Sequence, residues 1–273
     1  MAGPQGGAPE PYLGLALGGG GARGLCHIGV LTVLEELGIH PDVVSGTSMG
    51  GLVGAFVAAG YTAAEMDAVA RDMRWARLID WRITGRLMST RAFEDWLGDR
   101  LPATFEELEL PLVLTASDLR RGQIHYLSEG DLIPAIRATT AYPGFVEPVE
   151  LPDAQLVDGG ILNQIPVDGA LFLGARRVLA VNATPLVAVE ATAEGPRRHR
   201  AAFREIMRSI DVMQAQLTSA RLSFYQPDVL LDPAIDGVEI GDFHKAAAAI
   251  EAGAAAARER ADDLLRLVPS PAG

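Results

Sequence analysis

Short apolar runs alternate with longer apolar or amphipathic stretches along this chain, which is typical of strands and helices that follow one another. Apolar runs predict strands at residues 13–17, 42–45, 112–116, 155–157, 178–181 and 229–231, and polar–apolar alternation predicts an edge or antiparallel strand at 123–127. Helical spacing predicts helices at 25–37, 49–59, 62–101 with a break at Gly85, 131–140, 201–225 and 243–267. The strand–helix–strand–helix order predicts an α/β fold, a three-layer sandwich with helices on both faces of a mainly parallel sheet.

Nothing in the sequence divides the chain into two domains. The 273 residues are 49% apolar and 21% charged, which is ordinary globular composition. We find no internal repeat and expect a single domain over residues 12–268, with a disordered tail at 1–11, rich in glycine and proline, and a short tail at 269–273. The single cysteine, Cys26, excludes a disulfide framework and any multi-cysteine metal site.

Charge and hydropathy limit the partners. A formal net charge of −12 without a basic region argues against nucleic acid, because phosphate binding needs clustered positive charge. The chain starts without the pattern of a signal peptide, and its longest apolar stretch is well short of the ~20 residues that cross a bilayer. We therefore expect a cytoplasmic location. The sequence gives no indication of the oligomeric state.

A glycine loop lies between the first predicted strand and the first predicted helix. Its sequence is Gly18-Gly19-Gly20-Gly21-Ala22-Arg23-Gly24. Backbone N–H groups in such a loop, together with the positive end of the helix dipole, favour negative charge. The loop predicts either a dinucleotide pyrophosphate site, because G-x-G-x-x-G is present, or an oxyanion hole. The dinucleotide interpretation also requires an acidic residue at the end of the second strand, where this chain has Ser45-Gly46.

A nucleophile elbow is predicted at the second strand–helix junction. Gly46-Thr47-Ser48-Met49-Gly50 fits the pattern G-x-S-x-G, with an apolar strand before it and an apolar helix after it. The serine hydroxyl would project from the turn and face the glycine loop. A serine that merely caps the helix is the alternative, and the adjoining glycine loop favours the nucleophile.

A serine needs a base to accept its proton, and the sequence offers two kinds. The five histidines are His27, His40, His125, His199 and His244, and we interpret all five as surface or core residues, although the order Ser48, Asp158, His244 would match a hydrolase triad. Asp158 ends a short strand before Gly159-Gly160 and is expected to be exposed at the carboxyl edge of the sheet. Partial desolvation would make its carboxylate more basic than usual.

Together, these three segments resemble the patatin-like phospholipase family. The family pattern is G-G-G-x-[K/R]-G, then G-x-S-x-G, then D-G-[G/A], and this chain has the same segments in the same order. The similarity extends over about residues 13–181 and includes Asn163 and Pro166 after the Asp-Gly-Gly segment. In the small-residue segment before Pro143-Gly144, Tyr142 is bulkier than the family pattern suggests.

The resemblance implies a lipid acyl hydrolase with no metal and no other cofactor. Ser48 would attack the ester carbonyl, Asp158 would accept its proton, and N–H groups around Gly20 and Gly21 would bind the oxyanion. Arg23 would orient the loop or contact an anionic head group. The alternatives are a dinucleotide-dependent enzyme and a non-catalytic lipid-binding module.

The predicted helix over 201–225 begins beside several arginines. They are Arg197, Arg198, Arg200, Arg204 and Arg208. Packing of this helix on the sheet is the favoured interpretation, because most amphipathic helices face their own core. Peripheral contact with anionic lipid is the alternative.

Overall fold

A computed structural model describes residues 12–72, 90–184, 198–235 and 237–269. The strands are β1 Leu13–Leu17, β2 Val43–Thr47, β3 Leu112–Asp118, β4 Gln123–Leu127, β5 Val149–Glu150, β6 Gln155–Asp158, β7 Arg177–Val181 and β8 Val229–Leu231. The helices are α1 Cys26–Glu36, α2 Met49–Ala58, α3 Ala63–Asp72, α5 Thr90–Gly98, α6 Leu132–Thr139, α7 Val167–Phe172, α8 Arg198–Phe224, α9 Ala246–Glu259 and α10 Ala261–Leu265.

The sheet combines a parallel centre with an antiparallel margin. Strands β3, β2, β1, β7 and β8 pair in parallel, each with the next. Strands β4 and β6 pair antiparallel with β3, and β5 pairs antiparallel with β6. The predicted mainly parallel sheet is therefore confirmed, and so is the antiparallel strand at residues 123–127.

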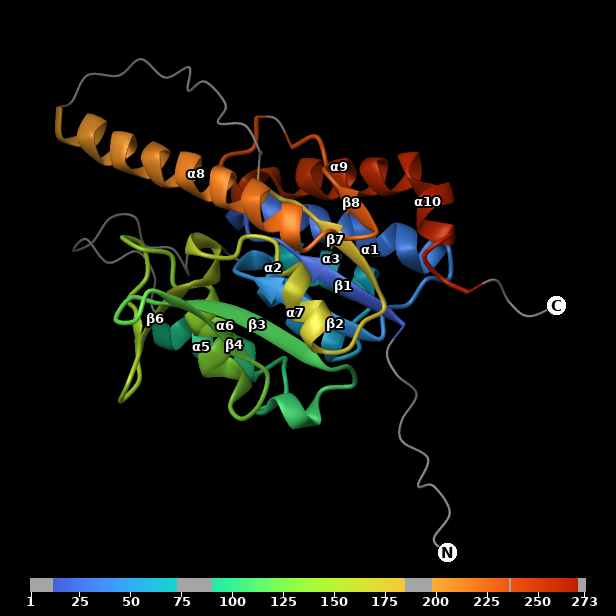
Figure 1. The fold of residues 1–273 in the computed structure, drawn as a ribbon, viewed down its shortest axis with the longest axis horizontal. Helices are drawn as coiled ribbons and strands as arrows, with labels where there is room; N and C mark the ends of the chain where they lie inside the picture. Colours follow the sequence, from blue (N-terminus) through green and yellow to red (C-terminus); the bar gives the residue numbers. More distant parts are fainter. Residues whose placement is uncertain (1–11, 73–89, 185–197, 236, 270–273) are drawn as a thin grey trace, which may run out of the picture.

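Helices cover both faces of the sheet, as expected. Side chains at alternate positions of β1 point to opposite faces: Leu13, Leu15 and Leu17 join the core shared with α1 and α2, whereas Ala16 packs with residues of α7. α7 lies close to the sheet, because a Cβ on Gly14 would lie 2.7 Å from the Cβ of Ala175, just after α7. Figure 1 shows α7 in front of β1 and β2, with α8 crossing above them.

Several elements differ from the sequence predictions. α7 and β5 were not predicted, because six residues after Pro166 and a two-residue strand are too short to show a period. The helix expected over 243–267 is divided at Arg260, where φ −106° and ψ 19° leave the α-helical region, into α9 and α10. The break predicted at Gly85 lies outside the described residues, as does the tail at residues 1–11. The domain boundaries therefore stay a prediction.

Candidate active site

The turn between β2 and α2 holds Ser48 in a backbone conformation that side chains rarely adopt. Its φ is 54° and its ψ is −124°, and within the described part of the chain it is the one non-glycine residue with a positive φ. Two hydrogen bonds hold this strained turn: the Ser48 N–H donates to Thr139 Oγ1 at 2.9 Å, and the Leu52 N–H donates to the Ser48 carbonyl at 3.0 Å. The side chain of Ser48 is half-buried, as the predicted elbow requires.

Two glycines allow the turn to be this sharp. A Cβ on Gly46 would lie 2.5 Å from the Cα of Gly51, so the first turn of α2 packs directly on β2. A Cβ on Gly50 would lie 2.2 Å from the carbonyl oxygen of Leu17, so α2 also contacts the end of β1. The elbow is therefore fixed by close backbone packing, for which the motif glycines are required.

The register of the strands places Asp158 beside the turn that holds Ser48. β4 shares residues of β3 with both β2 and β6, so β4 must occupy one edge of β3, and β2 and β6 must share the other. β2 runs along this edge and ends at Thr47, opposite Thr115. β6 runs along it in the opposite direction and ends at Asp158, opposite Ala116. The carboxyl ends of the two strands thus meet, and Ser48 follows Thr47 at the meeting point.

Ser48 and Asp158 are joined by a hydrogen bond across 110 positions of sequence. Ser48 Oγ donates to Asp158 Oδ2 at 2.5 Å, and the Gly160 N–H donates to Asp158 Oδ1 at 2.8 Å. The Asp158 N–H donates to the Ala141 carbonyl at 3.0 Å, which anchors the aspartate from the other side. The expectation that Asp158 is exposed is wrong: only 1% of its surface is accessible, because the end of β6 is covered.

Burial changes the acidity of this carboxyl group. Desolvation raises the pKa of Asp158 to about 7, although the hydrogen bonds from Ser48 and Gly160 act in the opposite direction. A carboxylate with such a pKa accepts a proton far more readily than an ordinary aspartate does, and near neutral pH it exchanges the proton in both directions. The geometry and the acidity of this pair therefore suit proton transfer from the serine hydroxyl.

The glycine loop packs against the elbow. A Cβ on Gly19 would lie 3.2 Å from the Cβ of Ser48, and a Cβ on Gly24 would lie 2.6 Å from Cγ of Met49. Residues 21–25 form a 3-10 helix that leads directly into α1. The predicted pairing of loop and elbow in space therefore matches the geometry of the structure.

The backbone N–H groups of the loop divide into two sets. Four already donate to carbonyl groups: Gly18 to Val181, Gly19 to Gln164, Ala22 to Ile240 and Arg23 to Gly20. Among the described residues, none accepts a hydrogen bond from the N–H groups of Gly20 and Gly21. The same holds for the Met49 N–H at the start of α2. These three N–H groups remain as donors for a bound anion, and the Met49 N–H was not among the donors expected from the sequence.

Two side chains brace the loop from behind. Arg23 Nε donates to the Val238 carbonyl at 2.6 Å, which agrees with an orienting role for this arginine. His27 Nε2 lies 2.7 Å from the Gly18 carbonyl, to which it donates, and burial lowers the pKa of His27 to about 4. His27 is thus a neutral, buried anchor of the loop.

The other described histidines lie away from the pair. His40 and His244 are exposed, and Nε2 of His125 lies 3.7 Å from Asp118 Oδ2. None of the described histidines hydrogen-bonds Ser48 or Asp158. The side chain of His199 lies outside the described part.

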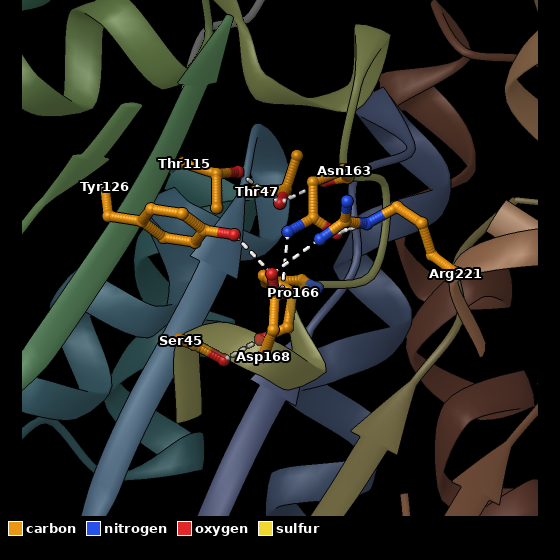
Figure 2. Close-up of polar contacts among 8 residues, drawn as sticks. All are labelled: Ser45, Thr47, Thr115, Tyr126, Asn163, Pro166, Asp168 and Arg221. Carbon is orange, nitrogen blue, oxygen red and sulfur yellow. Dashed lines mark hydrogen bonds and ion pairs between the residues drawn. The ribbon is translucent and has the colours of Figure 1, made fainter. Parts of the chain in front are cut away.

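A polar network joins residues near Ser48 and Asp158 in the sequence, and Figure 2 shows its contacts. The hydroxyl of Thr47 donates to the Asn163 carbonyl at 2.8 Å and pairs with Thr115 Oγ1 at 2.6 Å. The Asn163 side chain donates to Asp168 at 2.8 Å and accepts from Arg221 at 3.1 Å. Asp168 also forms an ion pair with Arg221 at 2.5 Å and accepts from Tyr126. The network ties the strand before Ser48 to the segment after Asp158.

An apolar crevice lies between α1, α2, α3 and α5. Met49, the neighbour of Ser48, lines it together with Leu52, Met66, Ala70 and Trp96. All its lining side chains are apolar, as a hydrocarbon chain would require.

Comparison with known proteins agrees with this geometry. A mainly parallel sheet that presents a glycine loop and a strained strand–turn–helix serine at its carboxyl edge places the protein among α/β folds of the hydrolase type. Residues 15–171 match the family model described as patatin-like phospholipase, and the chain belongs to that family.

Relatives of known sequence include much longer proteins. An NTE family protein of Mycobacterium tuberculosis is 35% identical over 190 residues, which cover 64% of this chain and 50% of the relative. Human patatin-like phospholipase domain-containing protein 6 is 32% identical over 189 residues, which cover 62% of this chain and 13% of the relative. Lysophospholipase nte1 of Aspergillus fumigatus is 30% identical over 182 residues, covering 62% of this chain and 12% of that protein. The chain thus matches half or less of the length of these relatives.

A solved structure shares the fold. The structure of VipD from Legionella pneumophila superposes with a TM-score of 0.56 at 15% sequence identity. The match covers 95% of this chain and 67% of that one.

Proposed function

We propose that the protein is a lipid acyl hydrolase that cleaves carboxylic esters of lipids, phospholipids among them, through an acyl-serine intermediate. The observation that carries this proposal is the 2.5 Å hydrogen bond from Ser48 Oγ to a buried carboxylate whose pKa is raised to about 7. Family membership and the named lysophospholipase activity of the Aspergillus relative support it.

In the first half of the reaction, Ser48 Oγ attacks the ester carbonyl carbon while its proton moves to Asp158. The resulting oxyanion accepts hydrogen bonds from the free N–H groups of Gly20, Gly21 and Met49. The tetrahedral intermediate then collapses, and Asp158 gives its proton to the departing alcohol. One such N–H donor typically lowers the barrier by ~3 kcal/mol.

In the second half, a water molecule attacks the acyl-Ser48 carbonyl and gives a proton to Asp158. Collapse of the second intermediate releases the fatty acid and returns the proton to Ser48 Oγ. The acyl chain lies in the apolar crevice that begins at Met49. Arg23 keeps the glycine loop in place through its bond to Val238.

Labelling with a fluorophosphonate tests this proposal, because the reagent reacts with activated serines. We expect the wild-type protein to be labelled and Ser48→Ala not to be, while both keep the same circular dichroism spectrum. An unlabelled, folded wild-type protein would reject the proposal. NAD binding in that protein would favour the dinucleotide alternative, and lipid binding without labelling would favour a non-catalytic module.

The crevice makes a separate prediction about acyl chains. Ala70→Leu adds bulk to its lining, so we expect kcat/KM for long-chain esters to fall about threefold while short-chain esters are unaffected. The same change at the exposed Ala255 of α9 serves as the control. Equal losses for short and long chains would remove the crevice from the substrate path.

A further inference from the structure

Helix α8 carries an apolar stripe that the rest of the described chain leaves uncovered. Ile206, Ile210, Met213 and Leu217 recur at spacings of four, three and four, so they share one side of the helix. Ile206 is 59% exposed, Met213 61% and Leu217 36%, while Ile210 between them is half-buried. The 83% exposed Phe224 continues the stripe at the end of the helix. A continuous row of this kind differs from the single exposed apolar residues of an ordinary surface.

The N-terminal segment of the same helix is rich in arginine, although the protein as a whole is acidic. The first eleven residues of α8 include four arginines and one acidic residue, Glu205, although the chain as a whole has a formal net charge of −12. The helical repeat places Arg208 on the side opposite the stripe, and Arg208 is exposed. An apolar face combined with an arginine-rich polar face is the pattern of helices that lie in the lipid–water interface.

Residues of α8 also contact the candidate active site. Gln214, next to Met213, donates from Nε2 to the Gly160 carbonyl at 2.9 Å, and Gly160 in turn holds Asp158. Asp211, one turn earlier, lies close enough to Arg23 of the glycine loop to interact with it electrostatically. Figure 1 shows the N-terminal half of α8 extending past the sheet.

We propose that α8 docks the protein on an anionic lipid surface, with the stripe from Ile206 to Leu217 inserted among the acyl chains. Long arginine side chains would reach the phosphate groups from the polar side of the helix. This inference rests on the proposed function, since a lipid surface is where a lipid hydrolase meets its substrate. Among the described residues no helix is long and apolar enough to cross a bilayer, so the docking proposed here is peripheral.

Binding to vesicles tests the proposal without any need for turnover. The full chain carrying Ser48→Ala is mixed with phosphatidylcholine vesicles that contain phosphatidylglycerol, and bound protein is measured by sedimentation. We expect Ile206→Ser with Met213→Ser to weaken binding at least about tenfold. Leu265→Ser, at a 46% exposed position of α10, is the matched control and should bind as well as its parent.

The charge component is tested by a second variant. Arg208→Glu should weaken binding to the phosphatidylglycerol vesicles about fivefold and leave binding to pure phosphatidylcholine unchanged. In the background with Ser48 intact, the stripe variant should hydrolyse a soluble short-chain ester at the wild-type rate. A wild-type protein that binds vesicles but does not hydrolyse this ester would reject the proposed function alone.

Two outcomes would overturn the docking proposal. One is equal vesicle binding by the stripe variant and its parent. The other is a dimer of the parent in analytical ultracentrifugation that the stripe substitutions dissociate, because a second copy of the chain would then cover the stripe.

Discussion

Ser48 and Asp158 reach the same point from two regions that are built differently. Ser48 follows β2, a fully buried strand at the parallel centre of the sheet, and glycine contacts with neighbouring backbone fix its turn. Asp158 ends β6, a four-residue strand at the antiparallel margin, and hydrogen bonds from Gly160 and to Ala141 hold it. Packing thus positions Ser48, whereas polar contacts position Asp158. Substitutions in the two regions should therefore affect activity and stability differently.

The largest effect is expected from the paired groups themselves. Ser48→Ala should lower kcat/KM for a soluble ester at least ~10⁴-fold, and Asp158→Asn about 10³-fold or more, because nucleophile and base act as a unit. Asp153→Asn, at an exposed position five residues earlier, is the control and should retain full activity. Activity of Asp158→Asn within tenfold of wild type would show that another group takes the proton.

The turn that holds Ser48 is fixed by close packing, so one added methyl group should destabilise it. Gly50→Ala places a Cβ 2.2 Å from the Leu17 carbonyl oxygen and 2.4 Å from that of Gly18, and neither backbone atom can move aside cheaply. We expect the free energy of unfolding to fall by about 3 kcal/mol in urea denaturation. Gly98→Ala in α5 has open space around the new Cβ and should be neutral or slightly stabilising. Equal stability of the two variants would contradict the packing argument.

The pH dependence follows from the raised pKa of Asp158. Its pKa rises from 3.8 to about 7, so kcat/KM should increase about tenfold per pH unit up to pH 7 and then level off, because only the carboxylate accepts the proton. Stability should change in the opposite direction. Between pH 3.8 and 7 the unfolded chain loses the proton before the folded one, so this group lowers the free energy of unfolding as pH rises. A pH–rate profile and denaturation at several pH values measure both, and Asp158→Asn should flatten both.

Smaller losses of activity are expected from changes in the polar network of Asn163, Asp168 and Arg221. Asp168→Asn leaves Arg221 without its carboxylate partner and weakens the bonds from Asn163 and Tyr126. We expect kcat to fall about tenfold with KM unchanged and the free energy of unfolding to fall by about 1–3 kcal/mol.

A surface ion pair provides the control for this variant. Asp67→Asn breaks the exposed pair with Arg71 on α3 and should change stability by less than ~1 kcal/mol without affecting kcat. If Asp168→Asn raised KM and left kcat unchanged, the network would serve substrate binding rather than the position of the serine.

The elements predicted most accurately from the sequence are apolar segments that have glycines at or near their ends. β1 was predicted with the observed limits, and α1 and α2 to within one residue at each end, because apolar runs bounded by glycine are unambiguous there. The three motif segments were expected to converge, and in the structure they do.

Contacts between distant polar side chains could not be predicted. The bonds that join Asn163, Asp168 and Arg221 connect positions up to 58 residues apart and leave no periodic trace in the sequence. The burial of Asp158 depends on β6 sharing an edge of β3 with β2, which is a matter of register rather than of composition. The contacts of Val238 and Ile240 with the glycine loop likewise come from a part of the chain without a motif.

The meeting of β2 and β6 on one edge of β3 has a consequence for the order in which the site forms during folding. A chain that has folded only as far as α6 would already hold the glycine loop and the elbow, yet would still lack the partner of its serine. Contacts of such long sequence separation form late in folding. Recovery of serine reactivity during refolding would therefore mark the completion of the native sheet, later than the return of helical signal.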